Sequence, residues 1–357
     1  MSAEKTGIGI IGTGNIAAPY VKDLQTYSDL ELIGAADVDH AKAVEFGEQN
    51  DVHIFPSVEA LLADGRIQIV ANLTSHFAHP DVTRQILHAG KHAFSEKPLA
   101  PTYDVARSLV EESNRLGLRL GCSPFTLLGE AQQTAWKLLR EGRIGTVTVA
   151  YAEVNWGRIE SWHPAPATFY EIGPLFDVGV YPLTILTAIF GPAQRVQSYG
   201  RVVYPDRLTK DGAPFHIDTP DFNVSIIELR DGVTVRLTTN FYIGHRTRQT
   251  GIEFHGHEGS LHLQAWHEFH SDVYLAPFGQ QFEKVEPVKA PYPGIAWGRG
   301  IHEMASALRE NRPHRATGEH AAHIVDILCA ATQSMQTQRP VDITSTFTPP
   351  APMEWAE

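Results

Sequence analysis

Short apolar runs alternate with amphipathic stretches along the first 122 residues. The apolar runs predict strands and the amphipathic stretches predict helices. Strands are expected at residues 7–12, 30–36, 53–55, 67–73, 93–95 and 119–122. Helices are expected between them, at residues 16–25, 41–50, 58–64, 80–89 and 103–116. Such regular alternation predicts an α/β domain with a doubly wound parallel sheet.

The pattern changes near residue 123. Most of the later strand-like runs alternate polar and apolar positions, as in residues 146–155, 195–203, 222–229, 233–241, 251–255, 259–264 and 268–275. Helices are expected at residues 127–141, 183–190, 300–310 and 318–334. Consecutive strands with segregated helices predict an α+β domain with a large, mostly antiparallel open sheet. The expected division is a first domain at residues 1–122 and a second at 123–357.

Composition narrows the class of protein. The chain has 357 residues, 43% of them hydrophobic and 20% charged, which is typical of globular domains. Its formal net charge of −12 argues against a nucleic-acid partner. The two cysteines, Cys122 and Cys329, form no framework of disulfides or metal ligands. We find no signal peptide and no run approaching about 18 apolar residues, so we expect a cytoplasmic protein that does not bind membranes.

A glycine motif lies between the first expected strand and helix. Residues 12–17 read Gly-Thr-Gly-Asn-Ile-Ala, which matches the dinucleotide-binding pattern GxGxxA. Gly12 permits a tight turn, Gly14 lets the backbone approach a pyrophosphate, and Ala17 lets the helix pack closely on the strand. This context predicts a Rossmann domain, with cofactor contacts from Gly12, Thr13, Gly14, Asn15 and Ile16.

The end of the second expected strand carries Asp37, 20 residues after Ala17. A carboxylate here can accept hydrogen bonds from the ribose hydroxyls of NAD, and it would repel the 2′-phosphate of NADP. The next residues are Val38, Asp39 and His40, so no arginine follows that could bind the phosphate. NAD(H) is therefore expected in preference to NADP(H).

Two further segments make the pattern more specific. Glu96-Lys97-Pro98 follows the fifth expected strand of the alternating region, and residues 177–181 read Asp-Val-Gly-Val-Tyr. Together with the glycine motif and residues 74–79, Thr-Ser-His-Phe-Ala-His, they resemble the Gfo/Idh/MocA oxidoreductase family in order and spacing. The resemblance extends from residue 7 to about residue 336.

The resemblance implies roles for residues near the nicotinamide. Lys97 resembles the family lysine that approaches both nicotinamide and substrate, with Glu96 and Pro98 fixing its strand end and Pro98 expected to form a cis bond. The segment at 74–79 resembles a loop that contacts the cofactor, but proline and asparagine commonly replace its second and third residues. Cofactor contacts are accordingly expected from Thr74, Ser75, His76, Glu96 and Lys97, whereas His79 is expected to be structural.

Tyr181 departs from many relatives, which carry a histidine at this position. The tyrosine form resembles the branch that contains glucose-fructose oxidoreductase and dimeric dihydrodiol dehydrogenase. An unperturbed tyrosine has a pKa of about 10, so a nearby cation such as Lys97 would have to lower it. We expect Tyr181 to act as acid/base, Lys97 to bind the reacting oxygen, and Asp177 to orient Lys97 or bind a substrate hydroxyl. The reverse assignment, with Lys97 carrying the proton, is the alternative.

The spacing of Asp177 and Tyr181 predicts a shared helix face, with a helix that begins near Asp177 and holds Pro182 in its first turn. Aromatic and polar residues that suit a sugar ring precede this motif: Trp156, Arg158, Trp162 and His163. Asn240, Tyr242, His245 and Arg246 are further candidates for the same pocket. The histidines at 255, 257, 262, 267 and 270 lack a ligand motif, so no metal is expected.

These observations predict an NAD-dependent oxidoreductase that acts on a secondary alcohol or carbonyl of a sugar, a polyol or a related small molecule. One alternative is an enzyme that recycles bound NAD during epimerisation or glycoside cleavage. Another is a sugar- or nucleotide-sensing protein without turnover. The family resemblance further implies a homodimer or homotetramer formed through the second domain's sheet.

Overall fold

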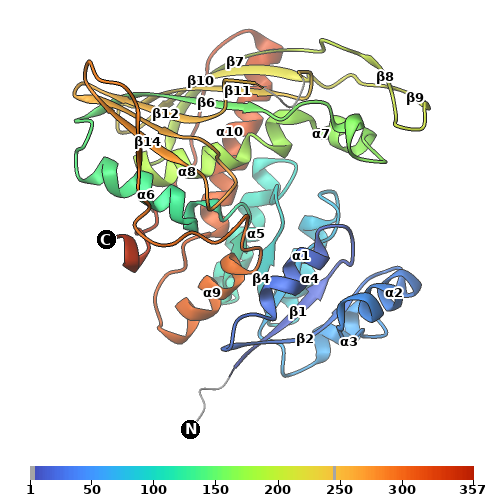
Figure 1. Ribbon diagram of the computed structural model, residues 1–357. Coiled ribbons are helices and arrows are strands. Elements are labelled where there is room, and N and C mark those ends of the chain that lie inside the picture. Colours follow the sequence, from blue (N-terminus) through green and yellow to red (C-terminus); the bar gives the residue numbers. More distant parts are fainter. Residues whose placement is uncertain (1–4, 244–246) are drawn as a thin grey trace. The chain divides into compact units, whose positions relative to one another are not determined.

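The computed structural model describes residues 5–243 and 247–357. Their contacts divide the chain into two compact units (Figure 1). Unit 1 comprises Met1–Phe125 and Ala296–Val325, and unit 2 comprises Thr126–Ile295 and Asp326–Glu357. The expected domain boundary, between residues 122 and 123, lies three residues before the point at which the chain first passes from unit 1 into unit 2. The expectation that everything after residue 122 forms one domain is wrong for 296–325, because helix α9 (Arg299–Arg309) packs against strands of unit 1.

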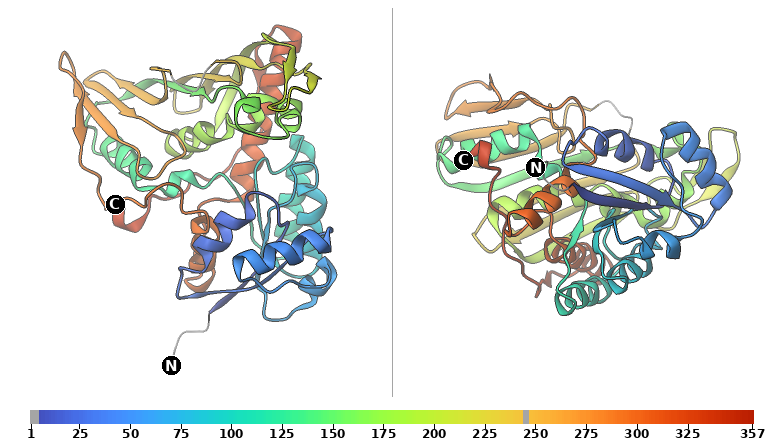
Figure 2. Two further views of the ribbon diagram at one scale, coloured as in Figure 1. Left: turned by 45° about the vertical axis from the view of Figure 1, so that its right-hand side comes forward. Right: turned by 90° about the horizontal axis from the view of Figure 1, so that it is seen from below.

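Unit 1 is built on a five-stranded sheet in which every strand pairs in parallel. Its order is β2-β1-β3-β4-β5, with β1 at Thr6–Ile11, β2 at Leu30–Ala36, β3 at Ile69–Asn72, β4 at His92–Ser95 and β5 at Leu120–Cys122. All six residues of β1 and all four of β3 are buried, as expected where helices cover both faces (Figure 2). The predicted doubly wound parallel sheet is confirmed.

The helices of unit 1 lie close to their predicted positions. They are α1 (Ala17–Leu24), α2 (His40–Asn50), α3 (Val58–Ala63), α4 (His79–His88), α5 (Tyr103–Arg115) and α9. The side chains of Asp39, Ser57 and Thr102 cap α2, α3 and α5 by accepting hydrogen bonds from backbone amides of their first turns. Residues 53–55 were predicted as a strand, but the structure forms only an isolated bridge between Ala35 and Ile54.

Unit 2 contains a nine-stranded, mostly antiparallel sheet, which confirms the predicted α+β class. Its strand order is β15-β14-β13-β12-β6-β11-β10-β7-β16, and β6 and β11 form its parallel pair. The central strands are β6 (Val147–Asn155), β7 (Ala193–Arg201), β10 (Phe222–Leu229), β11 (Thr234–Asn240) and β12 (Gly251–Gly256). Beyond β12 lie β13 (Gly259–Leu263), β14 (Val273–Pro277) and the edge strand β15 (Glu283–Val285). The other edge strand is β16 (Val341–Asp342), beside β7.

Burial alternates along the strands of this sheet. In β10, for example, every second residue from Asn223 is buried, whereas Ile226 is 42% exposed. One face therefore carries the core, and the helices lie along it: α6 (Glu130–Arg140), α7 (Ala167–Asp177), α8 (Val180–Phe190) and the second half of α10 (Gly318–Thr337) (Figure 1). The other face carries partly exposed side chains.

Two elements of unit 2 are absent from the predicted set. Helix α7 contains Gly173 and Pro174, residues that disfavour helices, and the backbone of Gly173 is non-helical with φ at 72°. The other is a small hairpin of β8 (Asp206–Leu208) and β9 (Pro214–His216). By length and composition alone, the stretch Ala167–Phe190 could cross a membrane, but 78% of its most apolar window is buried inside the protein.

Candidate functional site

The glycine motif forms the turn between β1 and α1. Gly12 has a φ of 101°, and a Cβ built there would lie 2.7 Å from the carbonyl carbon and oxygen of Leu73, so only glycine fits without strain. A Cβ built on Gly14 would meet nothing within 4 Å. The backbone at Gly14 therefore borders open space at the start of a helix, which is the arrangement that admits a pyrophosphate.

Asp37 is tied to this turn. Its Oδ2 accepts hydrogen bonds from the Thr13 amide at 2.7 Å and the Thr13 hydroxyl at 3.1 Å, and its Oδ1 accepts one from the Asp39 amide at 3.0 Å. Burial opposes ionisation, but the hydrogen bonds from Thr13 and Asp39 outweigh it and lower the pKa of Asp37. The ionised carboxylate has about four acceptor positions, so it retains capacity for a ribose hydroxyl.

The strand order places these groups together at one sheet edge. The order reverses between β1 and β3, and ligands of such sheets bind beyond the carboxyl ends of the strands at this point. Gly12 follows β1, Thr74 comes two residues after β3, and Glu96 follows β4 directly. The predicted nucleotide-binding residues of unit 1 therefore gather at the topological switch point.

The Thr74 segment is held from both sides. The Asn72 side chain accepts hydrogen bonds from the Thr74 hydroxyl at 2.7 Å and its amide at 3.3 Å. The ring nitrogens of His79 lie 2.8 Å from the Pro98 carbonyl oxygen and 3.1 Å from that of Thr74. Burial lowers the pKa of His79, and the ring lies between the two loops. A neutral imidazole carries one N–H and so donates to only one of these two carbonyl oxygens. The ring of His76 packs on Phe77, with centroids 3.9 Å apart.

Glu96 is the centre of a buried hydrogen-bond network. One carboxylate oxygen accepts bonds from the Tyr20 hydroxyl at 2.5 Å and the Ser123 hydroxyl at 3.0 Å. The other accepts a bond from the Lys97 amide at 3.1 Å, and the Lys97–Pro98 bond is cis, as expected. Tyr20 lies on α1 and Ser123 follows β5. This network connects the helix of the glycine motif to the backbone that carries Lys97.

Asp177 and Tyr181 lie on different helices. Asp177 is the last residue of α7, and α8 begins at Val180, so the expected single helix starting near Asp177 is wrong. Pro182 does lie in the first turn of α8, where its missing amide hydrogen costs nothing. Asp177 is buried and Tyr181 is half-buried. Both belong to unit 2 and Lys97 belongs to unit 1, so their joint action stays a prediction.

An aromatic cluster surrounds Tyr181 within unit 2. The Tyr181 ring lies 5.1 Å from that of Trp266, which in turn lies 5.7 Å from Trp156 and 4.3 Å from His267. Burial lowers the pKa of His267, and its buried Nδ1 has no hydrogen-bond partner among the described residues. Tilted aromatic rings beside an imidazole suit the apolar face and the hydroxyls of a ring-shaped substrate.

Sequence reasoning identified Trp156 in this cluster but missed Trp266, and it considered His267 only as a metal ligand. Trp266 and His267 follow β13 in a segment with no recognisable motif, and only the fold brings them to Trp156 and Tyr181. The described residues contain no group of three histidine, cysteine or acidic side chains placed to hold a metal ion.

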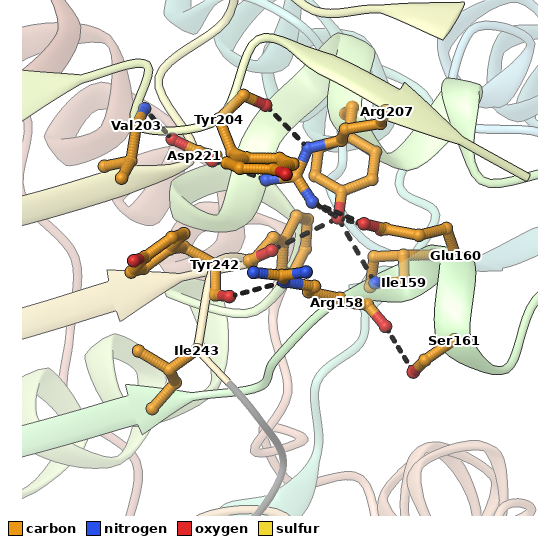
Figure 3. A network of polar contacts seen from close by, with 12 residues as sticks. Arg158, Ile159, Glu160, Ser161, Val203, Tyr204, Arg207, Asp221, Tyr242 and Ile243 are labelled. Carbon is orange, nitrogen blue, oxygen red and sulfur yellow. Dashed lines mark hydrogen bonds and ion pairs between the residues drawn. The ribbon is translucent and has the colours of Figure 1, made fainter. Parts of the chain in front are cut away.

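The other predicted substrate residues have contact partners outside this aromatic cluster. Trp162 and His163 pack against Phe169, with centroids 5.9 and 4.8 Å from it. Arg158 instead donates a hydrogen bond from Nε to the Tyr242 carbonyl (Figure 3). The Asn240 side chain bonds Asn155 at 2.5 Å. His245 and Arg246 lie outside the described residues.

Comparisons with known proteins agree with these features. The description "Oxidoreductase family, NAD-binding Rossmann fold" matches residues 6–123, and the GFO/IDH/MocA C-terminal domain matches residues 132–262. The chain therefore belongs to the GFO/IDH/MocA oxidoreductase family, as the sequence motifs predicted.

Three individual proteins illustrate the relationship. Trans-1,2-dihydrobenzene-1,2-diol dehydrogenase of Macaca fuscata fuscata is 28% identical over 187 residues, which cover 51% of this chain and 55% of that protein. The match thus spans little more than half of this relative's length. The 1,5-anhydro-D-fructose reductase of Ensifer adhaerens is 25% identical over 71% of this chain and 74% of its own. An oxidoreductase from Agrobacterium radiobacter, solved with NAD+, L-tartaric acid and magnesium, has the same fold at 17% identity, with a TM-score of 0.80 over 95% of this chain and 98% of that one.

Proposed function

We propose that this protein is an NAD-dependent oxidoreductase that transfers hydride between nicotinamide and a secondary alcohol or carbonyl of a sugar, a polyol or a related small molecule. The observation that carries the proposal is the arrangement of residues beyond the carboxyl ends of the strands of unit 1, where the strand order reverses. There the tight turn at Gly12, the open backbone at Gly14 and the Glu96-Lys97 segment all follow the carboxyl ends of strands of the same sheet. The dehydrogenase and reductase names of the two relatives agree with this reaction class.

NAD is the proposed cofactor in preference to NADP. The residues present fit the group, because Gly14 leaves room for the pyrophosphate and Asp37 is ionised with remaining acceptor capacity. A 2′-phosphate would meet this carboxylate, and Val38, Asp39 and His40 offer no guanidinium in compensation. When bound, the nicotinamide supplies the acceptor or donor of hydride.

The proposed roles of the chain's own residues follow from proton chemistry. Oxidation of an alcohol requires loss of its hydroxyl proton as hydride leaves the carbon. Tyr181 takes this proton, and Lys97 binds the reacting oxygen and favours the phenolate by its charge. Asp177, buried at the end of α7, orients Lys97 or binds a substrate hydroxyl. Trp156 and Trp266 provide ring faces on which a substrate ring packs.

The assembly and location are also proposals. The half-exposed face of the nine-stranded sheet is the surface through which we propose a homodimer or homotetramer to form. Tyr199 and Ile226, which are 51% and 42% exposed, lie on two of its neighbouring strands. We also propose a cytoplasmic location.

The experiment is a two-stage assay on the purified chain. Calorimetry first compares NAD+ with NADP+ binding, and tighter binding of NAD+ is expected. A panel of sugars, inositols and diols is then screened for NADH formation by absorbance at 340 nm. Absence of affinity for either cofactor would overturn the proposal. Product formation without net NADH would instead favour an enzyme that recycles its bound cofactor.

A further inference from the structure

Two arginines lie close together in unit 2 but have very different surroundings. Arg207, on β8, has a side chain with no exposed surface. Its Nη1 bonds Glu160 at 2.7 Å and its Nη2 bonds Asp221 at 2.5 Å. Figure 3 shows both carboxylates directed at this guanidinium. Arg207 therefore pairs with both carboxylates at once, so these three groups together keep one negative charge.

Further contacts complete the coordination of Arg207. Its Nη1 also bonds the hydroxyl of Tyr170 at 2.7 Å, and its Nε donates to the Tyr204 carbonyl at 2.9 Å. The other oxygen of Asp221 accepts a bond from the Val203 amide at 2.6 Å. A buried charge is tolerated only when it is paired and hydrogen-bonded, and Arg207 meets this condition fully. Arg207 is thus a structural arginine.

Arg158 is placed differently. Its Cζ lies 5.0 Å from the ring centroid of Tyr204 and 5.8 Å from that of Tyr242. Its Nε donates to the Tyr242 carbonyl at 3.0 Å, which fixes the plane of the guanidinium (Figure 3). Among residues 5–243 and 247–357, no carboxylate pairs with Arg158 and no group accepts a bond from its Nη atoms. The half-buried guanidinium is therefore oriented, but it is not neutralised.

From this contrast we propose that Arg158 binds an oxyanion of the substrate, a carboxylate or a phosphoryl group. A planar guanidinium recognises such groups through two parallel hydrogen bonds, and aromatic contacts that hold the plane reduce the cost of ordering it. Because the hydrogen bond that orients Arg158 uses Nε, its two Nη atoms remain available to bind the oxyanion. The substrate class narrows to hydroxylated molecules with one anionic group, such as sugar acids or sugar phosphates.

Arg158 follows the aromatic cluster closely along the chain, although its own contacts are with Tyr204 and Tyr242. Trp156, two residues earlier, contacts Trp266, and Trp266 contacts Tyr181. Gly157 separates Trp156 from Arg158 with a φ of 85°, a conformation that redirects the chain between the two side chains. The inference rests on the proposed function, because it assigns the anion to the molecule that Tyr181 and Lys97 act on.

The test compares matched ligands that differ in one group: D-glucose, D-glucuronate and D-glucose 6-phosphate. Calorimetry on the NADH-loaded protein measures their binding without requiring turnover. We expect one of the two anions to bind at least about tenfold more tightly than D-glucose, and which one it is identifies the carboxylate or the phosphate. Equal affinity for all three, or no binding of either anion at millimolar concentration, overturns the inference.

Substitutions test whether Arg158 is the residue that causes the preference for the anionic ligand. Arg158→Gln should abolish the preference for the anion, and Arg158→Lys, which keeps the charge but not the planar fork, should retain only part of it. The control is Arg195→Gln, which removes the same charge from a half-exposed arginine paired with Asp342. An anion preference that survives in Arg158→Gln, or that is lost equally in Arg195→Gln, contradicts the assignment.

The experiments distinguish failure of the proposed anion site from failure of the proposed oxidoreductase activity. If the anion binds through Arg158 but no member of an acid and phosphate panel is converted, the anion site stands and the proposed oxidoreductase activity fails. If an acidic or phosphorylated sugar is oxidised while Arg158→Gln changes neither kcat nor KM for it, the activity stands and the anion site fails. Unchanged Tm values in the Arg158 variants would show that either result comes from a folded protein.

Discussion

The nucleotide-binding edge of unit 1 and the aromatic region of unit 2 assemble their functional groups in different ways. In unit 1 the important contacts come from consecutive residues at strand ends, and several of them involve the backbone, as at Gly12, Gly14 and Lys97. In unit 2 they come from side chains of separate segments, such as Trp156, Trp266 and Tyr181. The first kind of site is conspicuous in a sequence, whereas the second requires the fold.

The largest expected effect tests whether both regions serve one reaction. Lys97→Ala and Tyr181→Phe should each lower kcat by roughly 10²-fold or more, the usual contribution of general acid–base groups. Steady-state kinetics on the best substrate of the panel provides the measurement, and Lys22→Ala, an exposed lysine on α1, is the control. Near-wild-type rates in both variants would show that the two regions do not cooperate as proposed.

The second prediction separates the two glycines of the turn. Gly12→Ala places a methyl group against the Leu73 backbone at a positive φ, so the free energy of unfolding should fall by about 2 kcal/mol or more. Gly14→Ala adds a methyl group to open space and should leave stability within about 0.5 kcal/mol. It should nevertheless weaken NAD+ binding about tenfold, since the backbone can no longer approach the pyrophosphate as closely.

Denaturant unfolding and calorimetry on the same preparations distinguish these outcomes. If Gly14→Ala binds NAD+ as tightly as the wild type does, the pyrophosphate does not lie against this residue. If Gly12→Ala is as stable as the wild type, the turn adapts to a side chain and the argument for a required glycine is lost.

The difference between the regions also explains what could be predicted from the sequence. The GxGxxA turn, Asp37 and Glu96-Lys97-Pro98 were identified because each is a short segment at the end of a strongly apolar strand. Helix α7 was missed because Gly173 and Pro174 interrupt the helical pattern. Arg207 could not be recognised because its partners, Glu160, Tyr170 and Asp221, come from three other segments.

A third prediction concerns the link between α1 and the Lys97 segment. Tyr20→Phe removes a buried hydroxyl that donates to Glu96, so that in this network the same carboxylate oxygen keeps only the hydrogen bond from the Ser123 hydroxyl. A lost buried hydrogen bond to a charged group should cost about 1–3 kcal/mol of unfolding free energy. Ser28→Ala, which removes an exposed hydroxyl elsewhere in unit 1, is the control.

Thermal and denaturant unfolding measure this difference directly. Equal stability of Tyr20→Phe and Ser28→Ala would contradict the view that the Glu96 network holds the Lys97 backbone in place. A loss of stability with unchanged kcat would limit the role of Tyr20 to folding.

The smallest expected effect concerns how the unfolding free energy depends on pH. It compares two histidines, one in each unit. Burial lowers the pKa of His320 to about 3, and the neighbouring His323 adds to this. The folded protein therefore keeps His320 neutral while the unfolded chain takes up a proton below about pH 6.5, so stability falls as the pH decreases from there. His216, on the hairpin of unit 2, has its pKa raised by its hydrogen bond to Asp206. Its contribution is fully present below the unfolded pKa and is lost as the pH rises through the folded value.

The two substitutions should therefore change the pH profile in opposite directions. Between pH 7 and 5.5, His320→Gln should lose about 1 kcal/mol less unfolding free energy than the wild type. The reason is that glutamine takes up no proton in the unfolded chain, whereas His320 does. His216→Gln should lose slightly more than the wild type over the same range, because a favourable imidazolium contact is removed. Unfolding free energies measured at half-unit intervals of pH give both slopes. Parallel profiles for the wild type and His320→Gln would mean that His320 accepts a proton in the folded protein, and the burial argument for this histidine would then be wrong.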